Sequence, residues 1–307
     1  MKPDHDMSLS LTIGPVQYHW GRDALLQFYA DVADSTARDV VIGEVVCSRR
    51  RDMKPVDWVA IAAELTQAGK QVWLGTLALI ETEAELRAVR QAVERGDVQI
   101  EANDAAAVRL AWHAGRPWSI GTHVNVYSSE ALAEYRDMGA TRWLAPVELD
   151  LAGVRTVAAA HRDAIAVEVM AFGRLPLALS ARCFTARHHN LQKDQCGFIC
   201  RDDPDGCTVR SQEGQVFLAL NGIQTQSGAV QCLVHHLPAL RAAGVDALRL
   251  SPCSQDFREV MAVYEALVAG DLAAQEAERV LRGLRLPGPL ADGFATAREP
   301  GMNWSMA

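Results

Sequence analysis

The chain has 307 residues, 49% of them hydrophobic, which suits one large α/β barrel or two ordinary domains with a sizeable core. Its formal net charge is −8, so we expect no general affinity for nucleic acid. No apolar run approaches the roughly 20 residues that cross a membrane, and the N-terminus lacks the pattern of a signal peptide. Seven cysteines, an odd number, favour the reducing cytoplasm over a disulfide framework.

Short apolar runs recur along the chain, and an amphipathic stretch follows each of them. We expect strands at residues 9–13, 39–45, 71–76, 98–102, 118–124, 142–147, 164–170 and 246–250. We expect helices at residues 22–33, 56–68, 82–94, 104–114, 128–138, 150–160, 230–243, 255–269 and 272–284. Ser128 is the expected N-cap of its helix. Strands that alternate with helices predict a parallel sheet covered on its faces.

Eight such strands predict a TIM-barrel-like (β/α)8 barrel, and the length agrees with that fold. An open doubly wound sheet is the main alternative, but its Gly-rich phosphate loop is not found after the first strand. The rhythm breaks between the seventh and eighth strands, where only residues 215–220 resemble an added strand. We therefore expect a leader at 1–8, one barrel domain at 9–285 with an insertion at 171–245, and a Pro- and Gly-rich tail at 286–307.

Polar side chains follow several of the expected strands, where a barrel places its reactive groups. Glu44, Glu101 and His123 are the candidate catalytic residues, and Asn125 and Glu148 lie at equivalent ends. As a set they predict a polar, acidic mouth that can hydrogen-bond a ligand. Each residue taken alone also fits a helix cap, a salt bridge or a solvated loop.

Three cysteines lie in the polar stretch before the last strand. Cys183, Cys196 and Cys200 have the spacing C-x12-C-x3-C and cationic neighbours, which stabilise thiolates. Cys47 follows the second strand, and the barrel would open this position onto the same face as the insertion. Four thiolates fit either zinc or an iron–sulfur cluster. Incidental cysteines, a redox pair or a disulfide remain the alternative interpretation.

Other cysteines and cations are open to simpler interpretations. Cys253 follows the eighth strand and is the rival for the fourth ligand position, whereas Cys207 and Cys232 are expected to be incidental. The arginine triplet 49–51 is either a solvated loop or a source of positive potential that stabilises thiolates or holds an anion. The histidine pairs 188–189 and 235–236 are expected to be structural or at the surface, because adjacent histidines do not converge easily on one ion.

Residues 43–50 (GEVVCSRR), 180–187 (SARCFTAR) and 221–225 (NGIQT) resemble the collagenase-like (U-type) peptidase superfamily. Within it, the chain is most similar to the branch that acts in ubiquinone biosynthesis. The resemblance implies a TIM-barrel-like fold and a 4Fe–4S cluster on Cys47, Cys183, Cys196 and Cys200. It implies a heterodimer with the paralogue UbiU and cooperation with the lipid-binding protein UbiT in oxygen-independent hydroxylation of a ubiquinone precursor.

Other functions within the same superfamily are possible. Related members hydroxylate RNA bases, with prephenate as the hydroxyl source, and the superfamily's label suggests a peptidase. No nucleophile–base pair or hydrolytic metal site can be read from the residues, so the peptidase interpretation has little support from the sequence. A cluster-bearing structural partner, with the chemistry in the other subunit, is a third interpretation.

Overall fold

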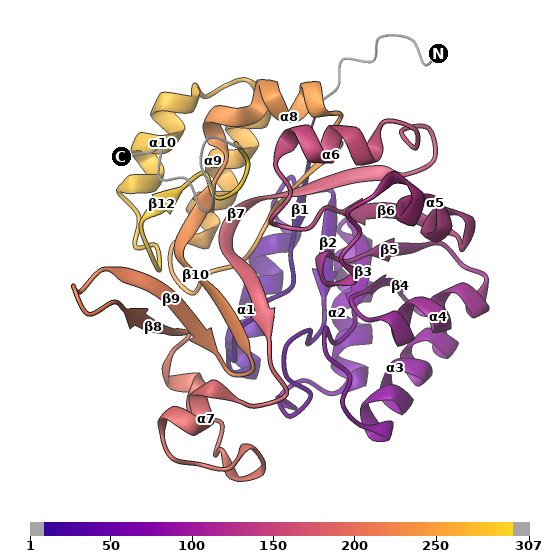
Figure 1. The fold of residues 1–307 in the computed structure, drawn as a ribbon, viewed down its shortest axis with the longest axis vertical. Coiled ribbons are helices and arrows are strands. Elements are labelled where there is room, and N and C mark those ends of the chain that lie inside the picture. Colours follow the sequence, from indigo (N-terminus) through magenta and orange to yellow (C-terminus); the bar gives the residue numbers. More distant parts are fainter. Residues whose placement is uncertain (1–8, 297–307) are drawn as a thin grey trace.

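A closed barrel of eight parallel strands organises the computed structural model, which describes residues 9–296 (Figure 1). Each strand pairs in parallel with the next, and the last one pairs with both the first and the seventh, which closes the ring. The predicted TIM-barrel-like fold is therefore confirmed. In chain order the barrel strands are β1 (Ser10–Ile13), β2 (Asp39–Ile42), β3 (Gln71–Gly75), β4 (Gln99–Ala102), β5 (Trp118–Ile120), β6 (Ala140–Leu144), β7 (Ala166–Leu179) and β11 (Ala247–Leu250).

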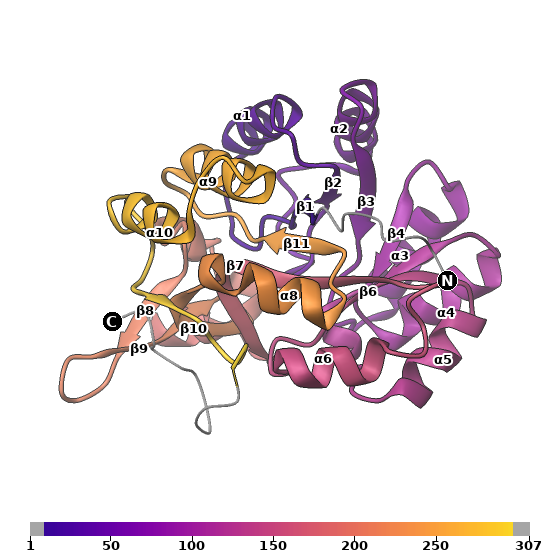
Figure 2. The same cartoon turned by 90° about the horizontal axis from the view of Figure 1, so that it is seen from above.

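Helices surround the barrel, as the view from above shows (Figure 2). Their apolar faces pack on the strands, and local signals start them: Ser128 Oγ accepts the Ala131 N–H at 3.1 Å, which confirms the expected cap. The helices are α1 (Arg22–Ala33), α2 (Pro55–Gln67), α3 (Glu83–Arg95), α4 (Ala105–Ala114), α5 (Ser129–Asp137), α6 (Leu151–Ala158), α8 (Leu237–Ala243), α9 (Phe257–Ala269) and α10 (Ala274–Arg282).

The seventh strand is longer than the sequence predicts. The prediction ended it at residue 170, but β7 runs on to Leu179 and leaves the barrel to pair with β10 (Gln224–Cys232) in antiparallel fashion. Gly173 lies where the strand leaves the barrel, with φ +118°, and a Cβ there would approach the Ser251 side chain to 2.5 Å. Only glycine fits this conformation and this close approach.

The insertion contains more sheet than the one added strand that was predicted. The strand predicted at 215–220 is confirmed as β9 (Val216–Asn221), which pairs with β10, and β8 (Cys207–Arg210) pairs with β9 and extends the sheet further. Residues 230–232 belong to β10 and not to a helix, because Val230 and Cys232 are buried against β7. The remaining short elements are α7 (Phe184–His188) and the 3₁₀ turns η1 (Thr122–Val124), η2 (Lys193–Gln195), η3 (Ile199–Asp202) and η4 (Val234–His236).

The segment expected as a tail starts as part of the folded body. The short strand β12 (Leu290–Ala291) pairs in parallel with Val230 and Gln231 of β10. Its apolar side chains are buried against the insertion, which explains why this Pro- and Gly-rich segment is ordered. The expected leader, residues 1–8, and residues 297–307 of the expected tail lie outside the described residues. Within residues 9–296, the helices are too short or too polar to span a membrane.

Candidate iron–sulfur site and its surroundings

The insertion folds back beside the loop after β2 and brings Cys183 to Cys47. Cys47 and Cys183 pack against the same small apolar cluster around Val46 and Ile223. The Phe184 N–H, next to Cys183, donates to Gly222 O at 2.9 Å. All four cysteines of the predicted set, Cys47, Cys183, Cys196 and Cys200, are half-buried and free of disulfides.

The four thiols are electrostatic neighbours. Burial raises the pKa of the Cys47 thiol, and Cys183 raises it further. Burial likewise raises the pKa of Cys200, and both Cys183 and Cys196 add to that effect. Arg50 acts in the opposite direction and lowers the pKa of Cys47 and of Cys200. Cys183 is thus a neighbour of both Cys47 and Cys200, and Cys196 is a neighbour of Cys200.

Hydrogen-bond donors face these sulfurs. The Ala186 N–H donates to Cys183 Sγ at 3.4 Å, and a backbone N–H of Arg49 lowers the pKa of Cys47 by donating to its thiol. Donors and a buried cation around thiols stabilise the thiolate form that iron requires. Among residues 9–296, no three His, Cys, Asp or Glu side chains surround a point that could hold one metal ion. The fit to a cluster therefore rests on the four soft donors and the N–H groups aimed at them.

The remaining cysteines have other neighbours. Cys253 is buried, its Sγ lies 3.3 Å from Gln255 O, and Asp205 and Asp256 are the charged groups that raise its pKa beyond the effect of burial. None of these contacts involves another thiol, so the geometry favours Cys47 over Cys253 as the fourth ligand. Cys207 begins β8, and Cys232 is buried 3.7 Å from the Tyr264 hydroxyl. Of the histidines, His235 pairs with Glu278 at 2.6 Å.

Glu44 shapes the cysteine loop. Its Oε1 accepts the N–H groups of Val46 and Cys47, each at 2.9 Å, and lies 3.7 Å from Arg50 Nη1. Burial raises the pKa of Glu44, and the Arg50 charge lowers it. Gly43 precedes it with φ +106°, and a Cβ there would meet Leu74 Cδ1 at 2.9 Å. The geometry gives this carboxylate a role in fixing the Cys47 turn.

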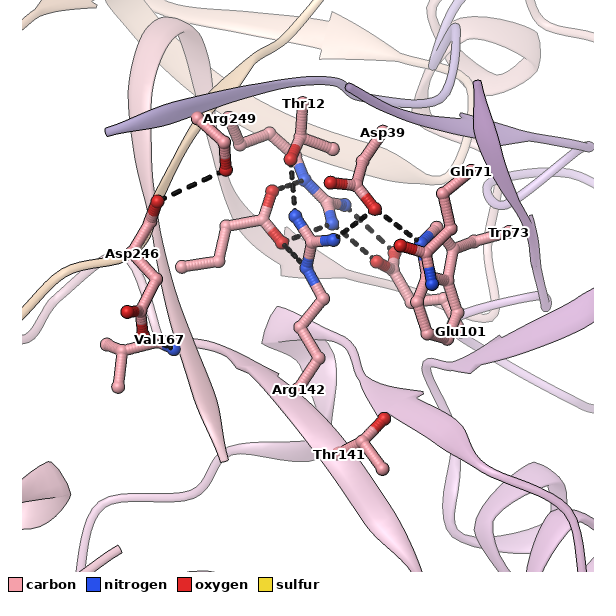
Figure 3. Close-up of polar contacts among 12 residues, drawn as sticks. Thr12, Asp39, Gln71, Trp73, Glu101, Thr141, Arg142, Val167, Asp246 and Arg249 are labelled. Carbon is pink, nitrogen blue, oxygen red and sulfur yellow. Dashed lines mark hydrogen bonds and ion pairs between the residues drawn. The ribbon is translucent and has the colours of Figure 1, made fainter. Parts of the chain in front are cut away.

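Glu101 lies inside the barrel, where it forms part of a buried ion-pair network (Figure 3). Arg249 donates to both of its oxygens, at 3.0 and 2.5 Å, and also to Glu168 at 2.9 Å. Arg142 joins Glu168 and Asp39, each at 2.7 Å. Burial would raise the pKa of Glu168, but Arg142 and Arg249 lower it to about 2. The expectation that Glu101 opens onto the mouth is therefore wrong, because its inward-pointing carboxylate is bound on both oxygens by Arg249.

The other predicted mouth residues do not converge. His123 lies in η1 after β5, half-buried, and burial lowers its pKa to about 4. Asn125 ends that turn with φ +60°, and Glu148 accepts a hydrogen bond from the Tyr127 hydroxyl at 3.3 Å. In the described part of the chain, no polar contact joins Glu44, Glu101, His123 or Glu148 to one another. The prediction that these side chains form a common acidic mouth is therefore wrong.

Sequence reasoning missed His19, which lies beside Cys200, and Asp52, which contacts His19. The ring of His19 is 3% exposed, and its Nδ1 lies 3.7 Å from Cys200 Sγ. Its Nε2 contacts the Asp52 carboxylate, which Arg201 also binds at 3.0 Å. Burial lowers the pKa of His19, and Asp52 opposes this effect. The sequence could have indicated His19 by its position, since it follows the first strand and therefore lies at the same end of the barrel as Cys47.

A groove of about 780 Å³ borders the Cys47 loop. Met53, Trp58 and Leu77 contribute to its apolar lining, and Arg49 and Arg51 line it from the cysteine loop. Ligand sites of this size, mostly apolar with a few polar groups, are typical of small-molecule binding. All three arginines of the triplet line the groove, and Arg50 is the buried one among them.

The fold and this site define a (β/α)8 barrel protein that carries a cysteine-bearing insertion. The model of peptidase family U32 matches residues 24–285, and the chain belongs to that family. A relative named collagenase, from Porphyromonas gingivalis, is 27% identical over 190 residues, which cover 58% of this chain and 45% of that protein. The match thus spans less than half the length of this relative.

Two solved structures are also similar. The U32 peptidase Mk0906 gives a TM-score of 0.44 at 9% identity, covering 82% of this chain and 96% of that one. Dihydropteroate synthase from Thermus thermophilus gives a TM-score of 0.42 at 14% identity, covering 86% of this chain and 97% of that one.

Proposed function

We propose that Cys47, Cys183, Cys196 and Cys200 hold a 4Fe–4S cluster and that the chain acts in oxygen-independent hydroxylation of a ubiquinone precursor. The observation that carries the proposal is a series of neighbouring thiols, in which Cys183 lies near both Cys47 and Cys200, and Cys196 lies near Cys200. The motif around these cysteines resembles that of UbiV, the ubiquinone-biosynthesis member of the superfamily. This resemblance supports the specific pathway, and family membership supports the fold and the broader class.

The residues around the thiols have defined roles in this proposal. The N–H groups of Arg49 and Ala186 and the cation of Arg50 hold negative charge on sulfur, and Glu44 keeps the Cys47 turn in shape. A bound cluster would supply electron transfer at this place. The adjoining groove, lined by Trp58 and Leu77, offers an apolar surface for the ring of the precursor beside the cysteine loop.

A partner subunit is part of the same proposal. The resemblance supports a heterodimer with the paralogue UbiU and cooperation with the lipid-binding protein UbiT. On the insertion, Phe217 is 63% exposed and Leu191 is 39% exposed, so apolar side chains are available for a protein contact. Co-expression with the paralogue should give a one-to-one complex, and a chain that stays monomeric in its presence would contradict this part.

Anaerobic purification tests the cluster. We expect about four iron and four sulfide per chain, as four cysteine ligands imply. Alanine at Cys47, Cys183, Cys196 or Cys200 should abolish the bound iron, whereas Cys207→Ala should retain it. Full iron in Cys47→Ala would overturn the ligand set. A deletion strain grown without oxygen should lack ubiquinone, and normal ubiquinone in that strain would rule out the pathway.

A cysteine hydrolase is the second candidate, and one specific arrangement favours it. Cys200, His19 and Asp52 form a thiol–imidazole–carboxylate chain of the kind that activates a nucleophile. Burial raises the pKa of Cys200, which weakens it as a nucleophile. Peptide cleavage by the metal-free protein that is lost in Cys200→Ser and retained in Cys196→Ser would favour this function over the first. Hydroxylation of RNA bases has no comparable support, given the net charge of −8.

A further inference from the structure

Arg50 is the buried member of the arginine triplet, and three segments of the chain meet around it. Its backbone N–H donates to Cys47 O at 3.0 Å and closes the cysteine turn. Nη1 donates to Gln17 O at 2.6 Å in the loop after β1, and Nη2 donates to Asn221 Oδ1 at 2.7 Å at the end of β9. The side chain is 3% exposed. One guanidinium therefore ties two barrel loops to the insertion.

A buried amide network holds these acceptors in place. Asn221 Nδ2 donates to Gln17 O at 2.7 Å and to Gln224 Oε1 at 3.2 Å. Gln224 Nε2 in turn donates to Gln17 Oε1 at 2.7 Å. Because all three residues are buried, the cost of breaking these bonds keeps the guanidinium in one orientation.

The positive charge of Arg50 is only partly balanced by carboxylate. Glu44 lies 3.7 Å away, and its Oε1 already accepts the N–H groups of Val46 and Cys47. The Arg50 Nε atom is buried without a hydrogen-bond partner. The guanidinium also forms a hydrogen bond with the Cys200 thiol and lies near the Cys47 thiol. A buried cation thus lies beside thiols from both the barrel and the insertion.

Two consequences follow from general physics. A cluster on four thiolates carries net negative charge, which increases on reduction, so a nearby buried cation stabilises the reduced form and raises the potential. The planar guanidinium also donates hydrogen bonds to two acceptors at fixed angles, and a lysine ammonium cannot reproduce this geometry. We propose that Arg50 is a positioning residue that brings Cys47 and Cys200 into register and sets the reduction potential of the cluster. This inference rests on the proposed function.

The test uses three variants of the full chain, purified without oxygen, with iron content and reduction potential as readouts. Arg50→Met removes both the bonds and the charge, so we expect about 10-fold weaker iron retention and a more negative potential in the cluster that remains. Arg50→Lys keeps the charge, so iron retention should fall while the potential stays near that of the unchanged protein. Arg187→Met, which removes an exposed arginine of α7 near Cys183, should change neither readout.

The outcomes separate this inference from the proposed function. If the wild-type protein binds no iron, the proposal of a cluster is wrong. If the wild-type protein binds iron and Arg50→Met has the same iron content and reduction potential, the proposed role of Arg50 is wrong, while the proposal of a cluster stands. If Arg50→Met fails to fold by circular dichroism, Arg50→Gln serves as the neutral variant. In addition, Asn221→Ala keeps the charge while removing an acceptor, so normal iron retention in it would overturn the positioning role.

Discussion

Arg249 clamps Glu101 inside the barrel through two hydrogen bonds, Nη1 to Oε1 at 3.0 Å and Nη2 to Oε2 at 2.5 Å. The same guanidinium binds Glu168 from a neighbouring strand. Branched apolar side chains commonly fill the interior of such barrels, and here a layer of charges takes part of that space. Because Arg249 binds both of its oxygens, Glu101 is a structural residue and no longer a catalytic candidate. We therefore expect substitutions in this network to change stability.

Removing one member of this pair should destabilise the protein. Arg249→Met leaves the Glu101 carboxylate buried without its cation and Glu168 with Arg142 alone, and we expect a loss of about 3–5 kcal/mol in the free energy of unfolding. Denaturant-induced unfolding followed by circular dichroism measures this loss. Arg155→Met, an exposed arginine on α6, is the control and should change stability little. A stability of Arg249→Met equal to that of the control would show that the network contributes nothing.

The network also predicts how stability depends on pH. The pKa of Glu168 is lowered from its ordinary value of 4.5 to about 2 because of Arg142 and Arg249, which outweigh the effect of burial. A lowered folded-state pKa adds stability that is present above the unfolded value, so the free energy of unfolding should fall as the pH falls from about 4.5 to about 2. Glu168→Gln should flatten the curve in this window, and the exposed Glu134→Gln should not. An unchanged slope in Glu168→Gln would contradict the ion pairing.

Oxygen sensitivity follows from the exposure of the four cysteines. Because Cys47, Cys183, Cys196 and Cys200 are only half-buried, small oxidants should reach a cluster bound there. Protein loaded without oxygen should lose its visible absorbance and its iron in air, while the far-ultraviolet circular dichroism of the barrel persists. Full retention of iron and activity after aerobic purification would place the cluster in a protected site instead.

Filling the groove should separate substrate binding from cluster binding. Ala84 lines the groove on the exposed side of α3, and Ala84→Trp would occupy part of its 780 Å³. We expect lower ubiquinone formation without oxygen and unchanged iron content, because the cysteines are not disturbed. Ala60→Trp, at an exposed position on α2 outside the groove, provides the matched control. Normal ubiquinone in the Ala84 variant would show that the groove does not hold the precursor.

Of the predicted catalytic residues, His123 can be tested in the same strain. Because His123 lies in η1 after β5, and not in the loop after β2 or in the insertion, its substitution by Gln should leave iron content intact. Its effect on ubiquinone formation decides whether the barrel end near β5 takes part. A ubiquinone level equal to that of the unchanged strain would leave the groove as the better site.

Much of the barrel was predictable from the sequence because its signals are local. The apolar runs, their spacing and the cap at Ser128 report which residues are buried and where helices start, and neighbours along the chain suffice to read them. The extension of β7 was missed because Gly173 and Pro176, which are typical of turns, interrupt the strand pattern after residue 170. Strand β12 was missed because its Pro- and Gly-rich surroundings are typical of a tail.

The sequence by itself determined the barrel, its eight parallel strands and the cysteines that could serve as ligands. Only the tertiary structure decided that Cys47 lies beside Cys183, that His19 contacts Cys200, and that Glu101 is paired with Arg249. These relationships join residues far apart in the chain, as the contact of His19 with Cys200 illustrates. Closure of the barrel and folding of the insertion set such distances, and burial then favours charges that are paired, as Glu101 is with Arg249.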